Sequence, residues 1–264
     1  MAFVLDEKGN YLPVLGEAAG GGGGTSDHAQ LTNLDYANSG HTGFMTSANY
    51  LPDGTTITVA SSGGDYTKLS EAVAFLQGKW SDGQVTISIS NGTYTESAKV
   101  TINTSLFNIP LLDITGADRE NTILNFLVGV AGGKNCKVRV RNLTIQGTGT
   151  NDSLLNIEDA MIFVQNVLFK NSWAGVYGRR LAEVNANNIY ADTLDYGIYA
   201  NEGGKIAISG TLTFKDVGTA AAVNWGAWII LNAPQKVFTN VTADTDVTPG
   251  TMNNLGIISG SFLS

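Results

Sequence analysis

The sequence predicts an all-β protein built as a single-stranded parallel β-helix, with one short helix capping the stack. Three observations predict this fold: a composition of strands and tight turns, a strand pattern that recurs every 20 to 24 residues, and a helical segment ahead of the repeats. Glycine accounts for 32 of the 264 residues, and only 14% of the residues are charged. A helical bundle would instead be rich in Ala, Glu, Lys and Leu.

Short strands rich in β-branched and aromatic residues recur in three series after Val138. The first series ends successively at Ile145, Phe169, Tyr190, Phe214 and Phe238, with steps of 24, 21, 24 and 24 residues. The second ends at Val140, Val164, Val184, Ile208 and Leu231, and the third comprises 154–157, 174–178, 196–200, 221–224 and 255–258. Three strands per repeat of this length match one coil of a parallel β-helix, because stacked coils share one core and pair their backbones. The longer last step of the third series predicts a departure from the repeat near the end.

A short polar residue follows each of the later strands of the first series by two positions. These residues are Asn171, Asp192, Asp216 and Asn240. Asn and Asp tolerate left-handed turns and form hydrogen bonds with neighbouring backbone groups. We therefore expect the four side chains to form a ladder at one corner of the stacked coils.

The segment 64–76 predicts the capping helix, with Thr67 as its cap and Leu69, Val73 and Leu76 on one face. This segment, "VTISISNGTYTESAKV" (85–100) and "LLDITGADRENTIL" (111–124) resemble the N-terminal portion of pectin-lyase-like right-handed β-helices. The resemblance implies right-handed coils and a helix closing one end of the core. The catalysis of that superfamily is not carried over to this chain. The Gln-Asp and Asp-Phe elements of the esterases and the paired aspartates and Gly-His-Gly of the polygalacturonase-like members are missing.

The chain is expected to divide into an attachment segment (1–19), a Gly-rich linker (20–26), a docking module (27–50) and the β-helix (51–264). The stretch "DHAQLTNLDYANSGHTGF" in the docking module resembles a short module of bacteriophage virion proteins that precedes fibre or spike domains. The resemblance implies a tail spike, tail fibre or capsid fibre that attaches to the host surface. It also implies a homotrimer that docks to other virion proteins through residues 1–45 and binds host surface polysaccharide.

Charge and composition narrow the other classes of function. The net charge of −8 argues against nucleic-acid binding. No stretch approaches the ~20 apolar residues of a membrane-spanning helix, so we expect no membrane insertion. Charged residues at 6–8 interrupt any signal peptide, and the single Cys136 excludes an intrachain disulfide. We expect a protein made in the host cytoplasm and located in the virion, without a cofactor.

The only two histidines, His28 and His41, lie in the docking module. Two ligands per chain are too few for a closed tetrahedral zinc site. In a three-fold assembly they would supply six nitrogens, enough for an octahedral ion on the axis. The alternative is that both imidazoles form hydrogen bonds with backbone at an interface.

Six carboxylates near predicted strand ends are candidates for glycan cleavage: Glu158, Asp159, Asp192, Asp195, Glu202 and Asp216. Adjacent coils are ~4.8 Å apart, so Asp192 and Asp216 at equivalent corners would approach the ~5–5.5 Å separation of retaining glycosidases. The predicted ladder accounts for the same two residues. A polysaccharide depolymerase, hydrolase or lyase, is therefore the alternative to a binding appendage, and a structural trimer without ligand is a second alternative.

Aromatic residues are the candidates for carbohydrate contact, because exposed rings stack on sugars. These candidates are Trp173, Tyr177, Tyr196, Tyr199 and Trp225, with core or subunit packing as the alternative. Tyr190 is expected in the core, since it shares a series with Phe169 and Phe214. The basic residues Lys137, Arg139 and Arg141 alternate with valines and so share one outer face, which is either solvated or binds an anionic polymer.

Overall fold

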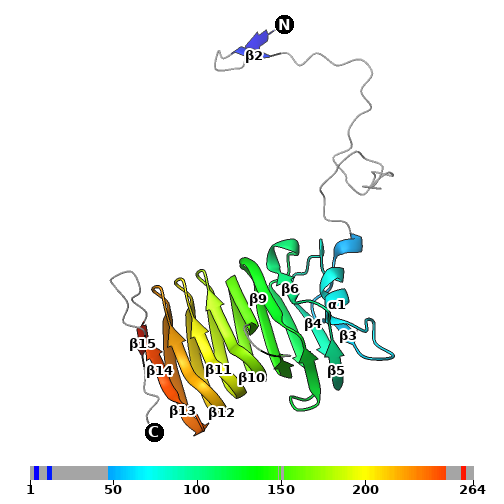
Figure 1. Ribbon diagram of the computed structural model, residues 1–264. Coiled ribbons are helices and arrows are strands. Elements are labelled where there is room, and N and C mark those ends of the chain that lie inside the picture. Colours follow the sequence, from blue (N-terminus) through cyan, green and yellow to red (C-terminus); the bar gives the residue numbers. More distant parts are fainter. Residues whose placement is uncertain are drawn as a thin grey trace. The chain divides into compact units, whose positions relative to one another are not determined.

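The computed structural model describes residues 3–5, 11–13, 47–147, 149, 152–247 and 257–259 (Figure 1). The chain forms two compact units, Met1–Thr46 and Ser47–Ser264. In the first unit, β1 (Phe3–Leu5) pairs antiparallel with β2 (Tyr11–Pro13). The predicted linker and the docking module up to Thr46, with His28 and His41, lie outside the described residues.

The second unit is a right-handed parallel β-helix of about six coils, which confirms the predicted fold class. Every pairing between its strands is parallel, and the main sheet has the order β15-β13-β12-β11-β10-β9-β7-β4-β3. A 3-10 helix, Ser47–Asn49, precedes the first coil. The strands of the β-helix are β3 (Thr55–Val59), β4 (Gln84–Ile89), β5 (Gly92–Thr95), β6 (Val100–Asn103), β7 (Leu111–Gly116), β8 (Thr122–Asn125), β9 (Val128–Gln146), β10 (Ser153–Arg179), β11 (Glu183–Ala200), β12 (Lys205–Val223), β13 (Trp228–Thr239), β14 (Ala243–Val247) and β15 (Ile257–Ser259).

From β9 onward each coil has three sides, and the long strands bend from one side to the next. Side A contains 137–141, 161–165, 183–187, 205–209 and 228–232. Side B contains 143–146, 167–170, 189–192, 212–215 and 236–239. Side C contains 128–131, 155–158, 172–178, 194–200, 217–223 and 243–247. Figure 1 shows these coils stacked side by side from green to orange.

The corner between sides B and C corrects the predicted ladder. Its left-handed residues are Asn171, Thr193, Asp216 and Asn240, with φ of 55°, 60°, 52° and 53°. Asp192 is not among them, because it pairs in register with Lys170 and Lys215 and lies one residue before the turn. The prediction is right for three of the four positions and wrong for Asp192.

A second polar ladder occupies the corner between sides A and B and was not predicted. Asn142, Asn166, Asn188 and Gly210 are left-handed there, with φ of 56°, 53°, 54° and 72°. Asn166 Nδ2 donates to Asn142 Oδ1 at 3.0 Å, and Asn188 Oδ1 accepts from the Thr211 amide at 2.9 Å. A Cβ at position 210 would lie 2.4 Å from Asn188 Oδ1, so glycine in the fourth coil leaves room for the Asn188 side chain.

The register of β10, β11 and β12 corrects two of the predicted series. Ala191, not Tyr190, pairs with Phe169 and Phe214, so the predicted core position of Tyr190 is wrong. Tyr190 faces outward, and the guanidinium carbon of Arg119 lies 3.7 Å from its ring centroid. In the same way, Ala186 and not Val184 pairs with Val164 and Ile208. In both series the shortest step was therefore assigned to the wrong residue. The true core residue at that step is an alanine, Ala191 or Ala186, and a larger side chain nearby matched the pattern better.

The end of the chain corrects the third series. The predicted strand 255–258 does not continue side C, whose last strand is β14, paired with 219–223 of β12. Instead β15 adds to side A by pairing with 228–230 of β13. This arrangement explains the longer last step of the third series, because its last strand belongs to side A and the others belong to side C.

Helix α1 (Leu69–Phe75) closes the N-terminal end of the core and contacts β3 and β6. Leu69, Val73 and Leu76 are buried, as predicted. The N-cap is Lys68 rather than Thr67, whose amide and hydroxyl both donate to the Glu71 carboxylate, at 3.3 and 3.4 Å. No helix in the described part of the chain is long and apolar enough to span a bilayer.

The buried thiol of Cys136 gives a first testable prediction. Burial raises the pKa of Cys136 to about 12, so at pH 8 only about one thiol in ten thousand is ionised, against roughly a quarter of ordinary thiols. We expect Ellman's reagent to modify the native protein about three orders of magnitude more slowly than the guanidinium-unfolded protein. The native rate should rise with pH well beyond pH 9. Rapid, complete modification at pH 8 without denaturant would contradict this.

Candidate functional site

Four of the five aromatic candidates gather on side C, and we call them the aromatic cluster: Trp173, Tyr177, Tyr196 and Tyr199. The first two come from β10 and the last two from β11. Trp173 lies at the centre, with ring centroids 5.7 Å from Tyr177, 5.3 Å from Tyr196 and 5.2 Å from Tyr199. Tyr199 also lies 5.2 Å from Tyr177 and 5.3 Å from Tyr196. All four side chains are half-buried, so each keeps part of its surface accessible.

Two glycines next to these rings explain why the chain places them there. A Cβ at Gly175 would lie 2.7 Å from the Gly197 carbonyl oxygen, and a Cβ at Gly197 would lie 2.5 Å from a ring carbon of Phe214. Only glycine permits this close approach to the core. The bulky neighbours Trp173, Tyr196 and Tyr199 therefore cover the outside of the same coils.

Polar groups border the aromatic cluster. Asn201 Nδ2 donates to the Tyr177 hydroxyl at 3.2 Å, and the guanidinium carbon of Arg179 lies 5.9 Å from the Tyr177 ring centroid. Asn201 Oδ1 and Arg179 Nε are both buried and have no hydrogen-bond partner in the described chain. Sugar sites combine apolar ring faces with a few placed donors and acceptors. This side of the coil offers both.

Trp225, the fifth aromatic candidate, is not part of the aromatic cluster. It lies at the corner between sides C and A, in a left-handed conformation with φ of 51°, and its residue is 55% exposed. The Gly203 amide donates to its carbonyl at 3.1 Å, which stacks this turn on the previous coil. Its position separates it from the other four candidates.

Three of the candidate acids lie at that same corner and take part in ion pairs or turns. Glu158 accepts from Arg179 Nη2 at 2.7 Å and pairs with Arg180. Glu202 lies 3.5 Å from Arg180 Nε. Asp159 is exposed and left-handed, with φ of 50°. The two glutamates thus bind a pair of arginines that the sequence pattern did not connect with them.

The other three acids lie near the corner between sides B and C. Lys215 Nζ lies 3.8 Å from an Asp192 oxygen and 3.4 Å from an Asp216 oxygen. Asn240 donates to Asp216 at 2.8 Å, and this hydrogen bond, with help from Lys215, lowers the pKa of Asp216. An acid with a lowered pKa is a poor proton donor at neutral pH. The predicted carboxylate pair is therefore separated by one residue of register and shares a lysine.

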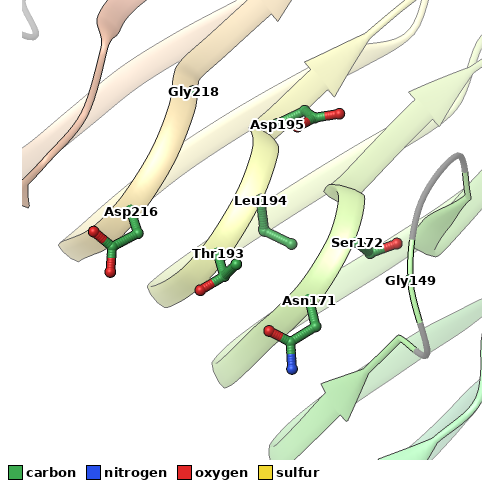
Figure 2. Close-up of a pocket in the computed structure, with 8 residues that line it drawn as sticks. All are labelled: Gly149, Asn171, Ser172, Thr193, Leu194, Asp195, Asp216 and Gly218. Atoms are coloured by element: carbon green, nitrogen blue, oxygen red, sulfur yellow. The ribbon is translucent and has the colours of Figure 1, made fainter.

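A pocket of about 410 Å³ lies at this corner, lined by Asn171, Thr193, Asp195 and Asp216 among others. Figure 2 shows Asn171, Thr193 and Asp216 in a row on successive coils, with Asp195 farther along its coil beyond Leu194. Asp192 is not among the residues lining the pocket. The pocket thus contains two of the candidate acids but not the pair proposed from the sequence.

Two of the three basic candidates clamp a single buried acid. Arg139 donates to Asp113 at 3.0 and 2.8 Å, and Arg141 donates to it at 3.2 and 2.9 Å. The Asp113 side chain is completely buried. Gln84 joins them, accepting from Arg139 at 3.2 Å. Only Lys137 of the three has no carboxylate within ion-pair distance in the described chain.

The described residues contain no group of three or more His, Cys, Asp or Glu side chains able to hold a metal ion. The metal candidates His28 and His41 lie outside the described residues. In comparisons with known proteins, no family model matches the chain, and no curated protein matches it significantly.

The acids near Lys215 give a prediction that separates binding from cleavage. We expect Asp192→Asn and Asp216→Asn each to leave the fold and the breakdown of host polysaccharide unchanged. An amide already occupies the turn position of Asp216 at Asn171 and Asn240, and an amide oxygen at position 192 can still accept from the Thr193 hydroxyl. The measurements are circular dichroism and release of reducing ends. Loss of polysaccharide cleavage in either folded variant would contradict the structural role.

The same carboxylate has a defined pH dependence. Because the pKa of Asp216 is lowered, its contribution to stability is present above the ordinary value of 3.8 and is lost as the pH falls through the folded-state pKa. The Asp216→Asn variant should lack this part of the acid dependence of the unfolding midpoint.

Proposed function

We propose that the protein is a bacteriophage virion appendage, a tail spike, tail fibre or capsid fibre, whose β-helix binds a host surface polysaccharide. The observation that carries the glycan-binding part is the aromatic cluster, four half-buried rings bordered by Asn201 and Arg179. The virion context is supported by the resemblance of residues 27–44 to a phage module, ahead of a β-helix. Residues 1–45 dock to the particle in this proposal.

Binding is favoured over cleavage by the surroundings of the acids. Glu158 and Glu202 are engaged by Arg179 and Arg180, and Asp192 and Asp216 by Lys215. A glycosidase needs one carboxyl group that keeps its proton at working pH and a second at a defined separation. The lowered pKa of Asp216 is opposite to that requirement. The depolymerase therefore remains the alternative function, without the predicted pair of Asp192 and Asp216 to support it.

A homotrimer is also part of the proposal. Leu181 and Trp225, at the corner between sides C and A, are 63% and 55% exposed. Backbone hydrogen bonds from Leu181 to Glu202 and from Gly203 to Trp225 stack these turns on successive coils. Two large exposed apolar side chains, two coils apart at one corner, favour contact with another subunit.

Removing a ring of the aromatic cluster should weaken glycan binding. We expect Trp173→Ala and Tyr199→Ala each to raise the Kd for the host oligosaccharide about tenfold, because each removes a stacking surface worth roughly 1–1.5 kcal/mol. A glycan array identifies the ligand, and titration calorimetry with a soluble oligosaccharide gives the affinity per subunit.

Leu106→Ala is the control, because it removes an exposed apolar side chain outside both the aromatic cluster and the corner proposed for the trimer. Its Kd should stay within about twofold of the parent. The proposal fails if Leu106→Ala weakens binding and Trp173→Ala, folded by circular dichroism, does not.

Light scattering on the full chain tests the assembly. We expect a particle of three times the chain mass of 27.8 kDa, since burial of the exposed apolar corner stabilises association. A species of 27.8 kDa at micromolar concentration would rule out the trimer.

A further inference from the structure

The outer face of side A contains a hollow that the aromatic cluster does not explain. Its central column of outward residues is Arg139, Phe163, Asn185, Ala207 and Ile230, one from each successive coil. Long side chains stand at both ends of this column, and the short Asn185 and Ala207 lie between them. Because coils are ~4.8 Å apart, the walls at Phe163 and Ile230 stand ~14 Å from each other.

Two adjoining pockets fill this space and share Asn185. One has a volume of about 490 Å³ and the other about 320 Å³. We call them together the side A trough. Its ring and apolar walls come from Phe163 at one end and Trp228 and Ile230 at the other, where the last two residues are 46% and 41% exposed. Its polar lining includes Gln165, Asn185, Asn187 and Ser209.

The trough is positively charged although the protein carries a net charge of −8. Lys137, Arg139 and Lys205 line it directly, and Arg141 and Lys134 lie at its border. These five cations face two carboxylates, Asp113 beneath the arginines and Glu183 beside Lys134. The face therefore has a formal excess of three positive charges.

Lys137 and Lys205 are the cations available to a ligand, since neither forms an ion pair in the described chain. Arg139 and Arg141 are held by Asp113, and Lys134 lies 2.5 Å from Glu183. No carboxylate of the described chain lies within ion-pair distance of Lys137 Nζ, which borders the larger pocket. An ammonium next to hydrogen-bonding amides and a phenyl ring suits a carboxylated, hydroxyl-rich ligand.

We propose that the side A trough is a second binding site, specific for an acidic oligosaccharide. Lys137 binds a carboxylate, the amides of Gln165, Asn185 and Asn187 bind hydroxyl groups, and Phe163 stacks on a sugar ring. The ligand lies across coils β9 to β13, on a different side of the β-helix from the aromatic cluster. The proposal is independent of the glycan proposed for side C.

The test uses the full chain and measures binding of hyaluronan and polysialic acid oligosaccharides by titration calorimetry, with dextran of similar length as a neutral probe. Lys137→Met removes the cation, and Ala207→Trp fills the floor of the trough without removing a contact. We expect each to weaken binding of the acidic oligosaccharides about tenfold or more, Lys137→Met through the loss of one charge-assisted contact and Ala207→Trp through exclusion of the ligand from the trough. Lys68→Met, which removes an exposed lysine far along the chain at helix α1, should have no effect.

Trp173→Ala separates this proposal from the previous one, because it should leave acidic oligosaccharide binding unchanged. If acidic oligosaccharides bind no better than dextran, the second site does not exist. If their binding responds to Trp173→Ala and not to Ala207→Trp, the acidic ligand belongs to the aromatic cluster. Equal affinity for heparin would extend the ligand class to sulfated sugars and overturn specificity for carboxylates. Equal affinity for single-stranded DNA would overturn the carbohydrate assignment.

Discussion

The fixed spacing of parallel strands governs the rest of this structure. Each coil lies ~4.8 Å from the next and is held by backbone hydrogen bonds in register, so every side chain lies directly against its counterpart one coil away. Core positions, corners and outer faces therefore become columns rather than isolated sites. The corner with Asn142, Asn166 and Asn188, the aromatic cluster and the side A trough are each such columns. They differ only in the side chains that successive coils contribute.

The fold was predictable because the repeat is a property of many residues at once, and a few wrong positions do not hide it. The register between strands was not predictable, since it depends on single residues. Ala191 between Phe169 and Phe214 fills a core column with a small side chain, and Tyr190 beside it looks like the better match. The corner at Asn142, Asn166 and Asn188 carried a usable signal, an asparagine directly before an apolar strand in three coils.

The candidate sites likewise include features that the sequence predicts and features that it does not. Four aromatic candidates were close in sequence within two coils, and stacking brought them together on side C. The partners of the acids were not visible, because Glu158 meets Arg179 and Arg180 only after a full turn of the coil. The trough forms because the side chains of Asn185 and Ala207 are shorter than those at the equivalent positions of neighbouring coils. No sequence motif predicts a hollow of this kind.

The clamp at Asp113 has a consequence for how the chain is made. Asp113 precedes its two partners, Arg139 and Arg141, by 26 and 28 residues. In a chain emerging from the ribosome, β7 is therefore complete while this carboxylate is still hydrated and uncompensated, and an ionised group of this kind resists burial without a partner. Arrival of β9 supplies both guanidinium groups together and removes the charge from water. We therefore expect the docking of β9 to fix the β7 coil, after which later coils are added one at a time onto a finished surface.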